Sequence, residues 1–242
     1  MKSKQTKGQF ITAAPARRPR TLRLCDLMTI DPLTDKQRDT FEAYKSGDHL
    51  ALVGTAGTGK TFLALYLAFE EMMNKSTVFE SVRIVRSVVP TRDVGFLPGT
   101  LEEKLDAFTG PYRSACAELF GDGEAYDKLI DANQLTFEST SFIRGVTYDN
   151  SIVIVDEMQN LNFHELDSII TRIGQNSKII FAGDYLQSDF KNKNEKEGIN
   201  TFLSILENMK HFSIITFTWE DIVRSDFVRD YIMTKEHMGI SS

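Results

Sequence analysis

Residues 54–61 read Gly-Thr-Ala-Gly-Thr-Gly-Lys-Thr and fit the pattern G-x-x-x-x-G-K-[ST] at every fixed position. An apolar stretch, HLALVG, leads into this segment, and a second one, TFLALYLAFEEMM, ends within the next twelve residues. The two flanks predict a strand that enters a glycine-rich turn and a helix that follows the turn. A phosphate-binding loop, or P-loop, requires this context, so the sequence predicts an α/β fold of the P-loop NTPase class.

The residue types of this loop suit a nucleoside triphosphate. The glycines let the backbone curl, so that several N–H groups point at one phosphate at the positive end of the following helix. Lys60 supplies a mobile charge for the β- and γ-phosphates, and the Thr61 hydroxyl is a ligand for Mg²⁺. The expected cofactors are therefore ATP and Mg²⁺. The predicted nucleotide-binding residues are Gly54, Thr55, Ala56, Gly57, Thr58, Gly59, Lys60 and Thr61.

A second apolar stretch ends in two carboxylates. Ile-Val-Ile-Val at residues 152–155 is followed by Asp156 and Glu157, which is typical of a Walker B strand. Because ligands of open α/β sheets bind at the carboxyl ends of the strands, Asp156 is placed to hold the Mg²⁺ shell. Glu157 is placed to orient or deprotonate the attacking water, a function that a small-molecule kinase does not need. The structural alternative is a pair of acids that caps a helix.

Two glutamines extend the predicted site. The buried strand SKIIFAGD ends in Gly183-Asp184, and Gln187, three residues further on, is placed as in the γ-phosphate sensor of superfamily 1 helicases, with Asp184 organising the loop. Gln37 lies on a predicted helix before the P-loop, where its amide can read the adenine edge by donating and accepting together. An ordinary turn and a surface glutamine are the respective alternatives.

Strands and helices alternate along the chain beyond residue 26. This alternation implies a parallel sheet with helices on both faces, in a single core domain. The expected strands are residues 49–54, 81–89, 135–140, 150–157, 177–184 and 211–218. The expected helices are residues 33–48, 61–73, 100–120 (with a break at Gly110-Pro111), 164–173, 199–210 and 222–235, and the segment 191–198, KNKNEKEG, is expected to be a polar loop.

Composition excludes several classes of protein. The 242 residues suffice for one well-buried α/β domain and contain no apolar run long enough to span a membrane. The two cysteines, Cys25 and Cys116, are far apart and near no histidine cluster, which argues against a disulfide framework or a zinc site. A reducing cytoplasm is the expected setting.

Charge divides the chain into two parts. Residues 1–25 hold seven basic residues and no acidic one, whereas the remainder has 21 basic and 34 acidic residues. We expect residues 1–25 to form a flexible basic arm and residues 26–242 to form the ATPase domain. A solvated terminus is one interpretation of the arm, and attraction to nucleic-acid phosphates is the other.

Together these segments resemble the PhoH family, the phosphate-starvation-inducible ATPases that are also widespread in phage genomes. The likeness runs from about Asp31 to Arg229, and Met158 is a departure because the family more often has alanine there. It rests on GTAGTGKTFLAL, VPTRDVGFLPGTLEEKL, FIRG, VDEMQNL, TRIGQNSKIIFAGDYLQSDF and DIVRSDFV. The resemblance implies a RecA-like ATPase core, similar to one domain of superfamily 1 helicases, and the host cytoplasm if the chain is phage-encoded.

The resemblance also implies a homo-oligomer, in the family a hexameric ring. A superfamily 1 helicase closes its ATP site with an arginine from a second RecA domain, which this sequence lacks. We therefore expect the arginine to come from a neighbouring subunit, as in a ring, or to be absent. The candidates are Arg144, Arg172 and Arg224, of which Arg172 and Arg224 lie in the strongest family matches; each has a structural salt bridge as its alternative.

The leading functional hypothesis is an oligomeric ATPase that acts on RNA or single-stranded DNA. The motifs support only the ATPase activity, and the resemblance implies the action on nucleic acid. Four residues after the second predicted β-strand suit contact with single-stranded nucleic acid, by stacking on bases and by binding phosphates. They are Arg86, Arg92, Phe96 and Lys104. A packed loop with solvated charges is their alternative. A second hypothesis is a nucleotide-dependent switch for assembly or partner binding, without nucleic acid. A third, a small-molecule kinase, is disfavoured by Glu157 and Gln187.

Overall fold

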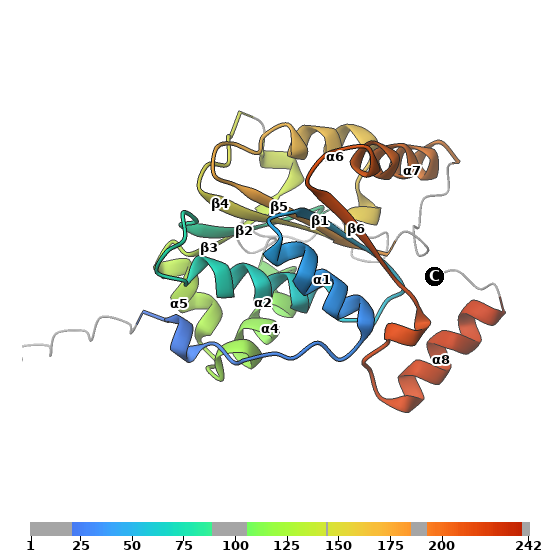
Figure 1. Cartoon of the computed structure of the whole chain (residues 1–242), viewed down its shortest axis with the longest axis horizontal. Helices are drawn as coiled ribbons and strands as arrows, with labels where there is room; N and C mark the ends of the chain where they lie inside the picture. The colour runs from blue at the N-terminus through green and yellow to red at the C-terminus, as the bar shows by residue number, and fades with distance from the viewer. Residues whose placement is uncertain (1–20, 89–105, 144, 185–192, 239–242) are drawn as a thin grey trace, which may run out of the picture.

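One parallel sheet organises the computed structural model, which describes residues 21–88, 106–143, 145–184 and 193–238 (Figure 1). Its strands are hydrogen-bonded in the order β3-β2-β4-β5-β1-β6, and each pair is parallel. The strands are β1 (His49–Gly54), β2 (Ser81–Arg86), β3 (Leu135–Ser139), β4 (Ser151–Asp156), β5 (Lys178–Gly183) and β6 (Phe212–Phe217). The six predicted strands are all present, several of them shorter than expected.

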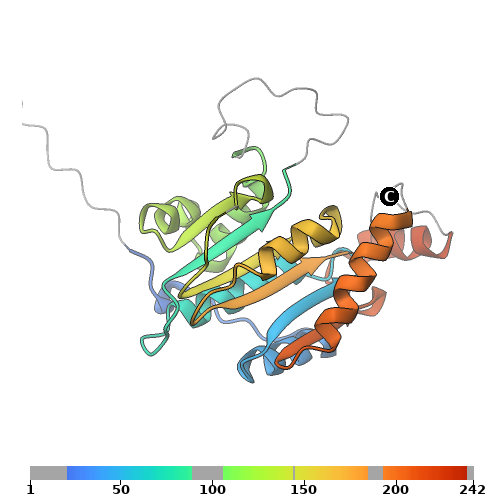
Figure 2. The same cartoon turned by 90° about the horizontal axis from the view of Figure 1, so that it is seen from above.

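Helices cover both faces of this sheet. In Figures 1 and 2, α1, α2, α4 and α5 lie on one face, α6 and α7 lie on the other, and α8 stands beyond β6. The helices are α1 (Asp35–Lys45), α2 (Lys60–Met72), α4 (Gly110–Phe120), α5 (Ala125–Asp131), α6 (Phe163–Ile170), α7 (Lys193–Glu207) and α8 (Asp226–His237). The predicted RecA-like α/β fold is confirmed. None of the helices in the described ranges is both long and apolar enough to cross a membrane.

The continuous apolar run of β4 is explained by burial on both faces. Ile152 and Ile154 belong to the core beneath α1, α2, α4 and α5, whereas Val153 and Val155 belong to the core beneath α6 and α7. Successive side chains of a strand point to opposite faces, so a strand covered on both faces has no polar position. After Ser151, which begins β4, the next polar side chain of the strand therefore comes at its carboxyl end, with Asp156.

Helix α1 begins at Asp35, directly after its capping residue, Thr34. The Thr34 hydroxyl accepts a hydrogen bond from the backbone N–H of Gln37 at 3.3 Å, which satisfies one of the free donors of the first turn. Phe41 and Tyr44 are buried at helical spacing, and Gln37 is buried on the same helix. This burial fixes the end of α1 that lies closest to the P-loop.

Three expectations about the helices were wrong. The segment predicted as a polar loop contributes the first turns of α7, which begins at Lys193 because lysine and glutamate are good helix formers even without an apolar stripe. Helix α5 was missed, because seven residues are too few for a clear period. Helix α8 begins at Asp226 and not at residue 222, since the preceding backbone bonds to the P-loop instead.

Candidate functional site

Three neighbouring strands bring the predicted motifs to one edge of the sheet. Strand β5 lies between β4 and β1, so the carboxyl ends of all three are adjacent. The P-loop follows β1 at Gly54, Asp156 ends β4, and Gly183 ends β5. Segments that are about 100 residues apart in sequence therefore face one another, as expected for a ligand site in an open α/β sheet.

The P-loop backbone adopts conformations that only glycine takes easily. Gly54, Gly57 and Gly59 have φ angles of +116°, +78° and +82°. Gly59 is the N-cap of α2 and offers no side chain to cap its first turn. The backbone N–H groups at the start of α2 are thus left for an anion, at the positive end of the helix dipole.

Gly54 is also closely packed, which leads to a first prediction. A Cβ atom at this position would overlap the carbonyl oxygen of Phe217, whereas one at Gly47, where φ is +95°, would meet no neighbour within 4 Å. We expect Gly47→Ala to cost about 1 kcal/mol of unfolding free energy, from backbone strain alone. Gly54→Ala should cost about 3 kcal/mol or more, since the loop and β6 must separate.

Urea unfolding of the two variants measures this difference. Gly47→Ala serves as the control, because it shares the positive φ and lacks the close contact. Equal losses of stability in the two variants would contradict the packing argument.

Lys60 is buried inside the loop that precedes it. Its ammonium group donates to the carbonyl oxygens of Gly54 at 2.8 Å and Thr55 at 2.7 Å, and it lies 3.3 Å from the Thr58 hydroxyl. Burial lowers the pKa of Lys60 to about 8, although Asp184 and the two carboxylates at the end of β4 act in the opposite direction. The lysine is therefore held where the negative charge of a phosphate would compensate its own.

The P-loop and β4 meet at Asp156. The Thr61 hydroxyl donates to Asp156 Oδ1 at 2.7 Å, although the two residues are 95 positions apart. The hydroxyl of Tyr112, on α4, donates to Asp156 Oδ2 at 2.7 Å. The predicted pair is thus brought together, whereas Tyr112 was missed because it belongs to no motif.

The donor set at Thr61 and Asp156 fits Mg²⁺. Hydroxyl and carboxylate oxygens are hard ligands, and Mg²⁺ is commonly held by one or two such groups together with substrate phosphates. No cluster of three or more His, Cys, Asp or Glu side chains that could hold a metal by itself occurs in the described ranges. The arrangement therefore suits a metal ion that is shared with a bound nucleotide.

The position of Glu157 is set by its backbone conformation and by the side chain of Gln159. Its backbone is left-handed, with φ of 53° and ψ of 43°, which is uncommon for a residue with a side chain. The Gln159 amide donates to the Glu157 carboxylate and accepts from the backbone N–H of Asp184 at 3.0 Å. Gln159 thus connects Glu157 to the end of β5. The sequence offered no sign of this role beyond a polar residue near the acidic pair.

Arg86 lies at the same end of the sheet. Its guanidinium is 4.0 Å from the Glu157 carboxylate and lies over the ring of Phe108, 5.9 Å from the centroid. Arg86 therefore faces the acidic pair and not an outward surface. This position does not suit the predicted contact of Arg86 with a nucleic-acid strand. The other candidates for strand contact, Arg92, Phe96 and Lys104, fall outside the described residues, as do Arg144 and Gln187.

Gln37 is brought to the P-loop, as the adenine hypothesis requires. Its amide nitrogen donates to the Thr58 carbonyl at 3.4 Å, and its amide oxygen accepts from the backbone N–H of Leu33 at 2.8 Å. Both ends of the amide are engaged, so its orientation is fixed. The side chain is buried and therefore is not the surface glutamine of the alternative interpretation.

The two remaining arginine candidates lie in different places. Arg224 is exposed beside the P-loop of its own chain: a Cβ atom on Gly57 would lie 3.2 Å from Arg224 Cγ. Arg172 follows α6, and its carbonyl accepts from the backbone N–H of Tyr148, just before β4 begins. Because β4 begins at the edge opposite its carboxylates, Arg172 is far from the P-loop of its own chain. Whether either arginine serves a neighbouring subunit stays a prediction.

A family profile described as PhoH-like protein matches residues 29–235, which is most of the chain. The chain belongs to the PhoH family. A PhoH-like protein of Synechocystis is 33% identical over 204 residues, which cover 84% of this chain and 61% of the relative. A PhoH-like protein of Bacillus subtilis is 32% identical over 197 residues, covering 81% of this chain and 60% of the relative. The chain thus spans about 60% of the length of these PhoH relatives.

Solved structures resemble this PhoH-family chain more distantly. A structure described as Bacteroides Pif1 bound to ssDNA is 12% identical, with a TM-score of 0.39, and covers 88% of this chain and 48% of that one. Bacteroides Pif1 in complex with ADP-AlF3 and ssDNA is 14% identical, with a TM-score of 0.37 and coverages of 87% and 49%. Likenesses this low support no conclusion about activity.

Proposed function

We propose that this P-loop NTPase binds Mg-ATP and hydrolyses it, and that it does so as a homo-oligomer acting on RNA or single-stranded DNA in the cytoplasm. The contact between Thr61 and Asp156 is the observation that carries the ATPase part. It joins the phosphate-binding loop to the acidic end of β4, with Glu157 as the next residue. The proposal therefore assigns a metal ion, a triphosphate and a base for water to this one place.

Each residue of the site has a distinct task in this proposal. Lys60 binds the β- and γ-phosphates as a positive charge, and the backbone N–H groups of the P-loop bind the same anion. Thr61 and Asp156 hold Mg²⁺, which neutralises charge on the phosphates when bound. Glu157 accepts the proton of the attacking water or orients it. Gln37 selects adenine in this proposal.

Two parts of the site complete the proposal. Gln187 reports the γ-phosphate, and an arginine from a neighbouring subunit stabilises the charge that develops during phosphoryl transfer. Of the two described candidates, Arg224 has the exposed side chain, which contact with another subunit requires. In Arg172 the Nε atom is buried and has no hydrogen-bond partner within the described residues. A side chain buried at this atom is less accessible to another subunit.

Binding of a labelled single strand tests the nucleic-acid part. We expect a fluorescent poly-uridine strand to bind more tightly with a non-hydrolysable Mg-ATP analogue than without nucleotide. The affinity should fall as salt rises, since phosphate contacts release counterions. The nucleotide effect should vanish in Lys60→Met. An anisotropy titration that shows no binding of RNA or DNA strands in any nucleotide state would contradict this part of the proposal.

A second candidate function is a nucleotide-dependent assembly switch. The backbone N–H of Val223 donates to the carbonyl of Gly57 at 3.2 Å, so the segment before α8 is attached to the P-loop. Helix α8 then exposes Phe227 and Tyr231, at 83% and 64%. A bound nucleotide can thereby alter an apolar surface. A change of oligomeric state with nucleotide, together with no binding of single strands, would favour this candidate.

A further inference from the structure

We propose that Tyr112 is a positioning residue for the Mg²⁺ site, acting through Asp156. The inference rests on the proposed function, because it concerns the metal that the nucleotide brings. Tyr112 does not touch the nucleotide or the metal in this proposal. Its task is to set the direction in which the Asp156 carboxylate faces.

The two oxygens of Asp156 have separate partners. Oδ1 accepts from the Thr61 hydroxyl and Oδ2 accepts from the Tyr112 hydroxyl, both at 2.7 Å. A carboxylate at the end of a strand can turn about its last side-chain bond, and two donors on opposite oxygens stop that rotation. The oxygen next to Thr61 is therefore the one presented to the metal, directly or through water.

The phenol of Tyr112 is the donor in its bond to Asp156, because an ionised carboxylate can only accept. The interaction is thus charge-assisted and lies in a fully buried place, where such bonds are strongest.

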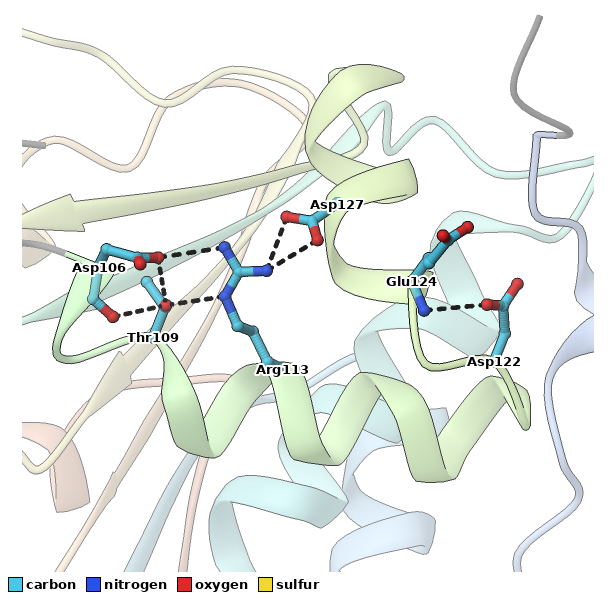
Figure 3. Close-up of polar contacts among 6 residues, drawn as sticks. All are labelled: Asp106, Thr109, Arg113, Asp122, Glu124 and Asp127. Atoms are coloured by element: carbon cyan, nitrogen blue, oxygen red, sulfur yellow. Dashed lines mark hydrogen bonds and ion pairs between the residues drawn. The ribbon is translucent and has the colours of Figure 1, made fainter. Parts of the chain in front are cut away.

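Helix α4 is anchored so that Tyr112 cannot easily move. Figure 3 shows the next residue, Arg113, clamped between neighbouring acids: it donates to both oxygens of Asp127 at 2.7 and 2.8 Å and to Asp106 at 3.1 Å. Its Nε also donates to the Thr109 hydroxyl at 3.2 Å. The ring of Tyr112 packs against Phe137, with centroids 5.5 Å apart. The anchoring of α4 and the packing of the ring therefore fix the Tyr112 hydroxyl in addition to its bond with Asp156.

The conservative variant Tyr112→Phe tests the proposal. Phenylalanine keeps the packed ring and removes only the hydroxyl. Tyr148→Phe is a matched control, because Tyr148 is equally buried and its hydroxyl donates to another carboxylate, that of Glu138, at 2.9 Å. Both purified variants would be compared with the wild type by binding of a fluorescent ATP analogue, in EDTA and across a series of Mg²⁺ concentrations.

The expected result distinguishes an effect on Mg²⁺ binding from an effect on nucleotide binding. In Tyr112→Phe the Mg²⁺ concentration that gives half of the metal-dependent tightening should rise about tenfold, as is usual when a group that orients a metal ligand is removed. The affinity in EDTA should stay at the wild-type value. Tyr148→Phe should match the wild type under both conditions.

Two outcomes would overturn the inference, and a third would overturn the proposed function on which it rests. An unchanged Mg²⁺ requirement in Tyr112→Phe would show that the hydroxyl does not position the metal ligand. An equal loss of affinity in EDTA and in Mg²⁺ would assign Tyr112 a purely structural role. A wild type that binds no nucleotide under either condition would remove the nucleotide site itself, which identifies a failure of the proposed function and not of Tyr112.

Discussion

Replacing Lys60 with methionine is expected to weaken binding of Mg-ATP at least about 100-fold, or about 2.7 kcal/mol. The variant keeps the apolar stem and removes the only ammonium group that the described structure places inside the P-loop, where it donates to the carbonyls of Gly54 and Thr55. Charge-assisted hydrogen bonds to phosphate are among the strongest in proteins, and the site is largely shielded from water. Calorimetry or a fluorescent analogue would measure the loss.

Lys178→Met is the matched control for this experiment. Lys178 is as buried as Lys60, but it lies at the start of β5, where it bonds to the Tyr44 carbonyl at 3.2 Å and to Glu71 at 3.3 Å. Loss of this lysine should lower stability and leave nucleotide affinity within about twofold of the wild type. Comparable affinities of the Lys60→Met variant and the wild type would contradict the assignment of Lys60.

Glu157→Gln should abolish hydrolysis while nucleotide binding persists. The amide has nearly the same shape as the carboxylate and cannot accept the proton of water, so we expect the turnover rate to fall by about 10²- to 10⁴-fold. The dissociation constant of Mg-ATP should change by less than about threefold, because Lys60 and Thr61 are untouched. Single-turnover hydrolysis and equilibrium binding together separate the two effects.

A second glutamate provides the control for Glu157. Glu138, on β3, is partly buried and pairs with Arg83 at 2.9 Å, much as Glu157 lies near Arg86. Glu138→Gln should therefore hydrolyse ATP at the wild-type rate if the fold is intact. A Glu157→Gln variant that retains full turnover would remove Glu157 as the base and leave hydrolysis without a described acceptor for the proton.

The parts of the site that the sequence predicts are those with local signals. The P-loop is one continuous segment whose glycines have positive φ, so its pattern is visible without the fold. Asp156 and Glu157 follow a strand buried on both faces, so the change from apolar to acidic residues marks the carboxyl end of β4. Strand alternation then predicts that these segments share one edge of the sheet.

The parts that sequence reasoning missed depend on contacts between distant segments. Tyr112 meets Asp156 across 44 positions, and nothing near Tyr112 in the sequence signals a carboxylate. Gln159 connects Glu157 with the backbone at Asp184, a contact that depends on the packing of η3 (Met158–Asn160) against β5. Arg86 turns toward Glu157 because β2 and β4 are paired in register at their last residues.

The most direct test of the account is steady-state ATP hydrolysis by the wild-type protein in Mg²⁺, with and without single-stranded RNA or DNA, beside Lys60→Met. The account predicts hydrolysis that rises when strands are added and disappears in the variant. Hydrolysis that is lost in the variant but is indifferent to strands would retain the ATPase and contradict its action on nucleic acid. No hydrolysis under any of these conditions would contradict the central claim and favour the assembly switch.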